Sequence, residues 1–221
     1  MGEILYFDTV LAPLSLFLPI GYHAYLWQCF KSKPSHTYIG IDALRRKGWF
    51  LDMKEDVDQK GMLAIQSVRN TLMSTIFIAS IAVLVSMALA ALTNNAYNAS
   101  QLFRSAFFGS QIGGIVVLKY GSASLFLLVS FLCSSMAVGF LIDANFLINI
   151  GIGQFSSPAY TQTIFERGFT LALIGNRMLC MTFPLILWIF GPVSMALSSL
   201  ALVWGLYELD FPGKLPSVKH G

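Results

Sequence analysis

The chain has 221 residues, of which 56% are hydrophobic and only 11% are charged, and its mean hydropathy is +0.68. A water-soluble domain carries about 25% charged residues, so this composition excludes an ordinary soluble globular fold. The formal net charge of +3 excludes little by itself, because its meaning depends on where the 14 Lys and Arg residues lie.

Four apolar runs predict an all-α fold, a polytopic membrane helical bundle with four transmembrane helices. A bilayer core of roughly 30 Å requires about 20 apolar residues per helix. The predicted spans cover residues 10–28, 71–92, 122–150 and 177–207 of one membrane domain, 1–221. The fourth run is long and contains Gly191-Pro192. It predicts either one tilted or kinked helix, or a hairpin that places the end of the chain on the other side.

The distribution of basic residues predicts the orientation of these spans. The first connection, 31–70, and the third connection together carry ten Lys and Arg residues, and the opposite face carries four. The positive-inside rule therefore predicts that both connections are cytoplasmic and that both termini are extracytoplasmic. Asn98 opens a possible glycosylation acceptor, Asn98-Ala99-Ser100, in the second connection, which agrees with this orientation. A plasma-membrane or secretory-pathway protein is expected.

A basic cluster, Arg45, Arg46 and Lys47, stands beside Trp49 and Phe50 in the first connection. This mixture is typical of a short amphipathic helix on the inner leaflet, with its cations facing anionic lipid headgroups. A loop held by tertiary packing is the alternative. Because the cluster adjoins a membrane, it gives no reason to expect a nucleic-acid partner.

Polar residues recur near the predicted cytoplasmic end of every span. Ionisable groups inside a membrane are costly and usually face the interior of the bundle. We therefore expect one buried polar layer that contains an Asp143–Arg177 ion pair and serves either to fix the helix arrangement or to form part of a proton or substrate path. Its predicted members are His23, Asn70, Asp143, Asn145, Asn176 and Arg177.

Small residues recur at every fourth position in three spans, which lets helices approach closely where lipid provides no hydrophobic driving force. Any such stripe that packs on no other helix of this chain is a possible docking surface for a partner. The stripes are Ala82, Ser86 and Ala90, then Ser135, Gly139 and Asp143, then Ser194 and Ser198.

Four short segments of the sequence together form a pattern known from other proteins. The segments are Gly21-Tyr22-His23-Ala24, Arg69-Asn70-Thr71-Leu72-Met73, Arg167-Gly168-Phe169 with Gly175-Asn176-Arg177, and the stretch from Phe183-Pro184 to Gly191-Pro192. With them the chain resembles the plant branch of domain-of-unknown-function family 599, whose members span the membrane several times and have no settled activity. The resemblance covers roughly residues 8–207, implies a membrane location, and transfers no catalytic residue.

The sequence contains no phosphate-binding loop, paired-cysteine metal spacing or nucleophile motif, so we expect no enzyme, metal or cofactor. The leading hypothesis is an accessory or assembly subunit that packs against a larger membrane protein or another copy of itself. The alternative is an oligomeric carrier or channel for an ion or small solute, which would use the polar layer.

Overall fold

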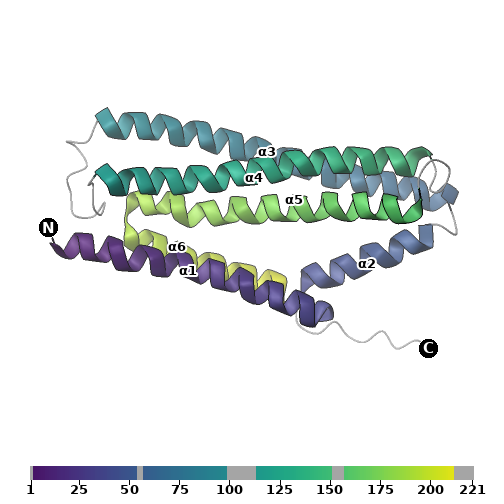
Figure 1. Ribbon diagram of the computed structural model, residues 1–221, viewed down its shortest axis with the longest axis horizontal. Helices are drawn as coiled ribbons and strands as arrows, with labels where there is room; N and C mark the ends of the chain where they lie inside the picture. Colours follow the sequence, from purple (N-terminus) through teal and green to yellow (C-terminus); the bar gives the residue numbers. More distant parts are fainter. Residues whose placement is uncertain (1, 54–56, 99–112, 151–156, 212–221) are drawn as a thin grey trace.

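A computed structural model describes residues 2–53, 57–98, 113–150 and 157–211 (Figure 1). Long helices lie side by side in one elongated bundle, and the shorter α2 crosses one end of it. The elements are α1 (Gly2–Ser32), η1 (Pro34–His36), α2 (Tyr38–Met53), α3 (Val57–Asn98), α4 (Gly113–Ile150), α5 (Pro158–Leu187), η3 (Trp188–Phe190) and α6 (Pro192–Asp210).

The predicted all-α membrane bundle is confirmed, and the described residues contain five helices long and apolar enough to cross a bilayer in place of the expected four. The difference arises in the fourth apolar run, where the hairpin alternative is the correct one. Gly191 has φ 142° and Pro192 opens α6, while the Ser194 hydroxyl donates to the carbonyl oxygen of Leu187 at 2.7 Å. A positive φ of this kind favours glycine and breaks the helix between α5 and α6.

The start of α5 lies 19 residues before the predicted start of this span, at Pro158. The Ser157 hydroxyl accepts a hydrogen bond from the Tyr160 amide at 3.2 Å and caps the helix. Its buried residues Ile164, Phe165, Gly168, Ala172 and Gly175 recur at helical spacing. The charged residues between them face outward, which is why this part of the sequence resembled a connection.

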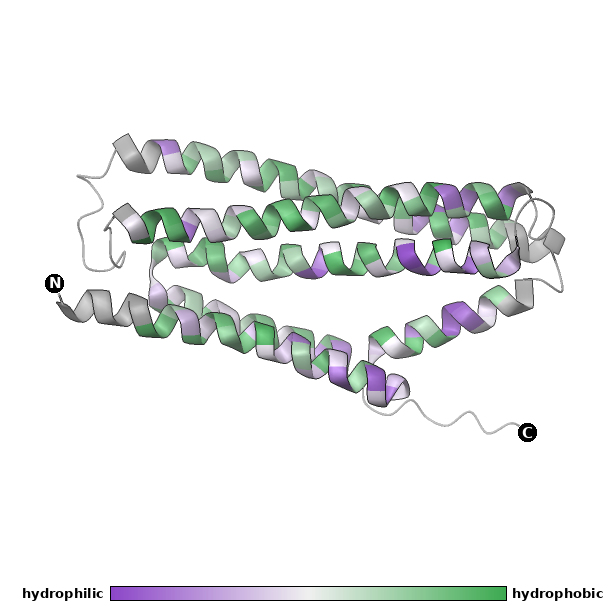
Figure 2. Ribbon diagram, in the orientation of Figure 1, coloured by the Kyte–Doolittle hydropathy of each residue, from purple (hydrophilic) through white to green (hydrophobic). Residues whose placement is uncertain are grey.

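Several of the helices are longer than a membrane is thick. Helices α3 and α4 have 42 and 38 residues, and at 1.5 Å per residue they measure roughly 63 and 57 Å, against a bilayer core of about 30 Å. Hydrophilic residues gather at the end of the bundle beside α2 (Figure 2). We call this end, where α2 packs on the first turns of α3 and α5 and on the last turns of α4, the platform.

The membrane section and the platform each have an apolar core of their own. In the membrane section, Ala12, Ala82, Leu127, Leu185 and Met195 belong to one cluster that joins all five spanning helices. In the platform, α2 contributes Phe50 to a second cluster. The other fully buried members of that cluster include Val68, Leu141, Ala144 and Phe165. The platform is therefore a packed helical unit and not a loose connection.

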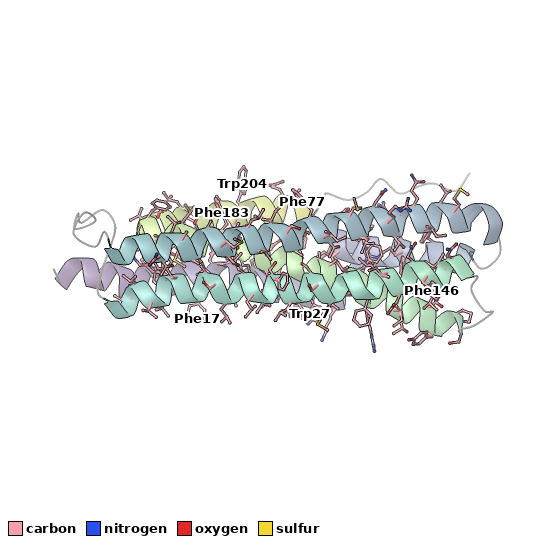
Figure 3. All side chains as sticks on the ribbon, turned by 90° about the horizontal axis from the view of Figure 1, so that it is seen from above. Phe17, Trp27, Phe77, Phe146, Phe183 and Trp204 are labelled. Carbon is pink, nitrogen blue, oxygen red and sulfur yellow. The ribbon has the colours of Figure 1, made fainter. Side chains whose placement is uncertain are left out.

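Large apolar side chains cover the outside of the membrane section (Figure 3). Phe17 is 69% exposed, Phe77 67% and Trp204 70%. In water such exposure would be unfavourable over so wide an area, but lipid tails solvate these side chains. The interior contains many small residues, as expected for helices that associate within lipid.

The sequence from Tyr38 to Met53 forms helix α2, which confirms the helical alternative for this segment. The Thr37 hydroxyl caps it by accepting from the Gly40 amide at 3.2 Å. A Cβ at Gly40 would lie 2.7 Å from the carbonyl carbon of Pro34, so only glycine permits η1 and α2 to pack this closely.

Candidate functional site

A buried ion pair joins α5 to α6 at the point where α6 ends. The Arg177 guanidinium donates to both carboxylate oxygens of Asp210, with Nη1 to Oδ2 at 2.9 Å and Nη2 to Oδ1 at 2.5 Å. The Asp210 side chain is 1% exposed and that of Arg177 is 15% exposed. A bidentate pair of this kind is strong and has a fixed geometry.

A third helix contacts the same carboxylate. The Tyr22 hydroxyl on α1 donates to Asp210 Oδ2 at 2.6 Å, and Tyr22 itself is buried. Asp210 therefore accepts three hydrogen bonds from two helices, and its charge is compensated by Arg177. We call Tyr22, Arg177 and Asp210 the polar node. It fixes α1 and α6 against α5 at one height in the bundle.

The apolar surroundings of the polar node come from α1 and α6. Tyr22, Leu26 and Leu206 form a small buried cluster, against which Leu202, Val203 and Phe211 pack. Helices α1 and α6 run in the same direction and contact each other along much of their length. This parallel arrangement is a direct consequence of the hairpin at Gly191, which returns the chain beside α1.

His23 adjoins the polar node, and its ring packs edge-on against Tyr22 with ring centroids 5.4 Å apart. Its Nδ1 lies 2.7 Å from the carbonyl oxygen of Pro19, to which the protonated nitrogen donates. Its Nε2 is buried and has no hydrogen-bond partner among the described residues. His23 is thus the one predicted layer residue, apart from Arg177, that lies close to the polar node.

The expected Asp143–Arg177 ion pair is wrong, because Arg177 binds Asp210 and Asp143 is exposed on α4. The contacts of α5 with α4 explain why. Gly175 packs at Ser134 and Gly168 packs at Leu141, so α4 passes Arg177 near Ser134. Asp143 is nine residues farther along α4, which places it about 14 Å closer to the platform.

The remaining predicted layer residues also fail to form a single buried layer. Asn70 and Asn176 are exposed on α3 and α5, respectively. Asn145 is half-buried, and its Oδ1 has no hydrogen-bond partner within the described part of the chain. The predicted layer is therefore divided between two heights. Only two of its members, His23 and Arg177, belong with the polar node.

Sequence reasoning missed Asp210, the acceptor at the centre of the polar node. The signal that could have identified it is a carboxylate placed 19 residues after Gly191, at the end of a helix of spanning length. That signal appears only when the fourth run is divided at Gly191-Pro192. If the fourth run formed one long helix, Asp210 would lie on the opposite side of the membrane from the start of α5.

The predicted basic cluster lies on α2. Arg45 and Lys47 are exposed, and Arg46 forms an ion pair with Asp42 one turn earlier. The Arg46 guanidinium also lies over the Phe169 ring of α5, 4.6 Å from its centroid. The possible glycosylation acceptor begins at Asn98, the last residue of α3, and its other two residues lie outside the described residues.

Comparison with curated proteins and with solved structures found no match. A family model described as "Protein of unknown function, DUF599" matches residues 10–214. This match spans all five membrane helices, the platform and every residue of the polar node. It confirms the family that the short sequence segments indicated. The chain is a member of the DUF599 family of proteins of unknown function.

Proposed function

We propose that this protein is a non-enzymatic accessory subunit, which binds a larger membrane protein through α4 and the platform. The single observation that carries this proposal is the packed platform, because the helices that build it with α2 have 42, 38 and 30 residues, more than the roughly 20 that cross a bilayer core. A protein that served only as a membrane anchor would not need helices of this length. An extra-membrane helical surface is suited to contact with a partner.

The platform end is the cytoplasmic end in this proposal. Helix α6 runs from the hairpin toward that end, so Lys214 and Lys219, which come after α6 in the sequence, are counted with the basic side. Only Arg104 and Lys119 of the 14 Lys and Arg residues then fall on the opposite side in chain order. This bias of Lys and Arg residues toward one side is stronger than the one expected for four spans, and it supports a cytoplasmic platform in a plasma or secretory-pathway membrane.

With five spans, α1 begins on the opposite side from the end of α6, so only the N-terminal end is extracytoplasmic in this proposal.

Helix α4 offers the surface for a partner helix. Ser135, Gly139 and Asp143 are all exposed, so this stripe packs on no other described helix of the chain. It continues toward the platform through Phe146, which is 62% exposed. In contrast, Ala82 of the α3 stripe is fully buried and is used within the bundle. A partner helix can approach α4 closely at Gly139, where no side chain intervenes.

Gly139→Leu tests the proposal, because a Cβ at Gly139 meets nothing within 4 Å and the variant should fold normally. We expect wild-type protein, purified from native membranes in a mild detergent, to carry a stoichiometric membrane-protein companion. We expect Gly139→Leu to lose that companion, because the new side chain holds a partner helix away from α4. Size-exclusion chromatography followed by mass spectrometry measures both results.

Gly121→Leu is the matched control. Gly121 is also an exposed glycine on α4, a Cβ added there would meet nothing within 4 Å, and it lies toward the other end of the helix. This variant should retain the companion. A wild-type protein that migrates alone as a monomer, or a companion retained equally by both variants, would refute the accessory role.

A carrier or channel is the second candidate, and buried Lys119 favours it. Lys119 is 2% exposed on α4 near the end opposite to the platform, with its Nζ 5.7 Å from the centre of the Trp188 ring. Together with Arg177, Asp210 and the buried Nε2 of His23, it places ionisable groups at two depths of the membrane section.

Flux measurements on reconstituted liposomes separate the two candidates. We expect the purified protein to conduct no more protons or small ions than empty liposomes do, because the three hydrogen bonds at Asp210 favour a fixed structural role. A pH-sensitive dye enclosed in the liposomes measures the proton flux. Flux that Lys119→Met abolishes, with folded protein retained, would favour the carrier instead.

A further inference from the structure

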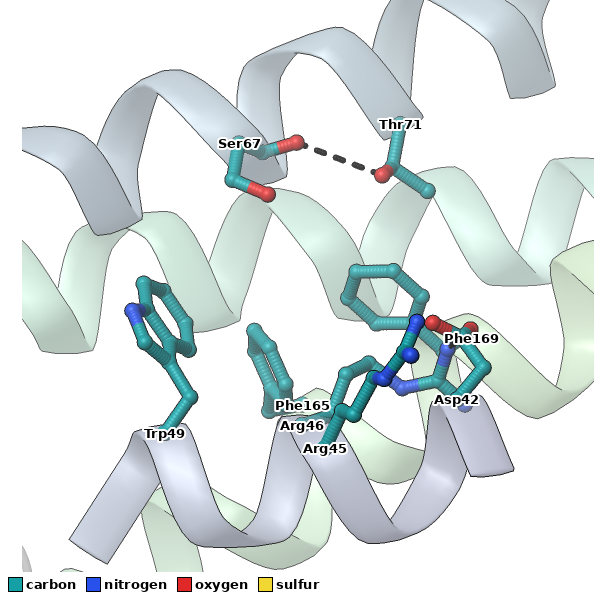
Figure 4. Close-up of a pocket in the computed structure, with 8 residues that line it drawn as sticks. All are labelled: Asp42, Arg45, Arg46, Trp49, Ser67, Thr71, Phe165 and Phe169. Atoms are coloured by element: carbon teal, nitrogen blue, oxygen red, sulfur yellow. Dashed lines mark hydrogen bonds and ion pairs between the residues drawn. The ribbon is translucent and has the colours of Figure 1, made fainter. Parts of the chain in front are cut away.

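We propose that a pocket between α2, α3 and α5 binds the phosphate headgroup of an anionic lipid. The pocket has a volume of about 510 Å³ and lies at the platform (Figure 4). The residues that line this site come from α2, α3 and α5, and none comes from the α4 stripe on which the partner proposal is tested. It adds a ligand and a binding site to a chain for which the family description gives neither.

Two arginines from α2 supply the positive charge. Arg46 is held in place by its ion pair with Asp42 and by the Phe169 ring beneath its guanidinium. Arg45 also lines the pocket, is exposed, and makes no hydrogen bond or ion pair within the described part of the chain. Because Asp42 compensates only one of the two arginines, the pocket retains a positive charge. Guanidinium groups match the geometry of phosphate oxygens.

Helix α3 supplies polar atoms on the opposite wall. Ser67 and Thr71 line the pocket there, one turn apart. The Thr71 hydroxyl donates to the Ser67 carbonyl oxygen at 3.2 Å, as Figure 4 shows. Within the described residues, the Ser67 hydroxyl forms no hydrogen bond and remains available to a phosphate oxygen.

The rest of the pocket wall is aromatic, which indicates an amphiphile and not a small soluble anion. Trp49 and Phe165 face each other with ring centroids 6.2 Å apart, and Phe165 contacts Phe169 at 4.8 Å. Such rings provide apolar area beside the cationic groups. An aromatic wall next to two arginines is suited to a ligand with a charged head and an apolar tail.

The height of the pocket agrees with a lipid headgroup. Its α5 residues, Phe165 and Phe169, lie 22 and 18 residues before Leu187, the last residue of α5. These separations correspond to about 33 and 27 Å of helix, close to the thickness of a bilayer core of roughly 30 Å. When the hairpin lies at one membrane surface, the pocket therefore lies at the headgroup region of the other.

Native mass spectrometry of the detergent-purified protein tests the site with defined probes. We expect wild type to retain short-chain phosphatidic acid in preference to phosphatidylcholine of the same chain length. Arg45→Gln should weaken retention of phosphatidic acid roughly tenfold, the effect of losing one charge-assisted contact. Lys47→Gln is the control, because Lys47 is exposed on the same helix but does not line the pocket.

Glycerol 3-phosphate serves as the soluble competitor, since it carries the phosphate of phosphatidic acid without the acyl tails. We expect it to displace phosphatidic acid from the protein poorly. Competition as strong as that of the lipid would support the phosphate contacts and overturn the lipid as their source. Equal losses from Arg45→Gln and Lys47→Gln, or equal retention of the two lipids, would overturn the site altogether. Gly139→Leu should leave lipid retention unchanged, so failure of the partner proposal remains distinguishable.

Discussion

Asp210→Asn is expected to lower the free energy of unfolding by about 3–5 kcal/mol, the usual effect of removing one partner from a buried ion pair. The substitution leaves the Arg177 charge without its counter-charge in a site where Asp210 is 1% exposed. It also weakens the hydrogen bond from Tyr22, which loses a charged acceptor. Folded yield and thermal stability in detergent, measured by fluorescence-detected size-exclusion chromatography, check the result.

Arg177→Met should be destabilising for the same reason, because it isolates the buried Asp210 carboxylate. The double variant Asp210→Asn with Arg177→Met should recover part of the loss, since neither uncompensated charge remains. Recovery on combining the two changes is the mark of a direct interaction. Losses that simply add would show that the two groups do not interact.

Asp143→Asn is the matched control for this series. It makes the same chemical change on a neighbouring helix, at an aspartate that is exposed and forms no ion pair within the described residues. Its effect should stay within about 0.5 kcal/mol, as is usual for surface substitutions. If Asp143→Asn proved as damaging as Asp210→Asn, the assignment of the Arg177 partner would be wrong.

The class of fold could be predicted from the sequence because it depends on bulk physical requirements. A chain with this hydropathy must bury its backbone polar groups within lipid, and helices achieve that segment by segment. The positions of α1, α3 and α4 followed from runs of apolar residues, which are a local property. The helical nature of α2 was an open alternative, because a 16-residue amphipathic segment depends on packing as much as on its own pattern.

The polar node could not be predicted because it depends on one local break in the chain. At Gly191 the sequence is compatible with either a kink or a turn, and the two outcomes place Asp210 on opposite sides of the membrane. The true start of α5 was concealed for a different reason, because the outward-facing charges of its first turns resemble those of a loop. Once α5 begins at Pro158, Arg177 lies well inside the helix and Asp143 lies too far toward the platform to reach it.

A close contact between α4 and α5 in the membrane section provides the second large effect. At Gly175, a Cβ would lie 3.2 Å from both the carbonyl oxygen of Ser130 and the amide nitrogen of Ser134, and closer still to the Ser134 hydroxyl. The Ser130 hydroxyl also donates to the Gly175 carbonyl oxygen at 2.7 Å, so α4 and α5 are bonded together here. A side chain larger than a methyl group at Gly175 must therefore push the two helices apart.

Gly175→Leu should therefore destabilise the protein by about 3 kcal/mol or more, through overpacking and through loss of the bond from Ser130. Gly139→Leu is the control of equal size on α4, and we expect it to change stability by no more than about 0.5 kcal/mol, because its Cβ meets nothing within 4 Å. The thermal stability of both variants in detergent checks this prediction.

Separation of α5 from α4 also displaces Arg177, two residues beyond Gly175, from Asp210. Gly175→Leu and Asp210→Asn should thus combine to less than the sum of their separate effects, whereas full additivity would mean that close packing and the polar node act independently.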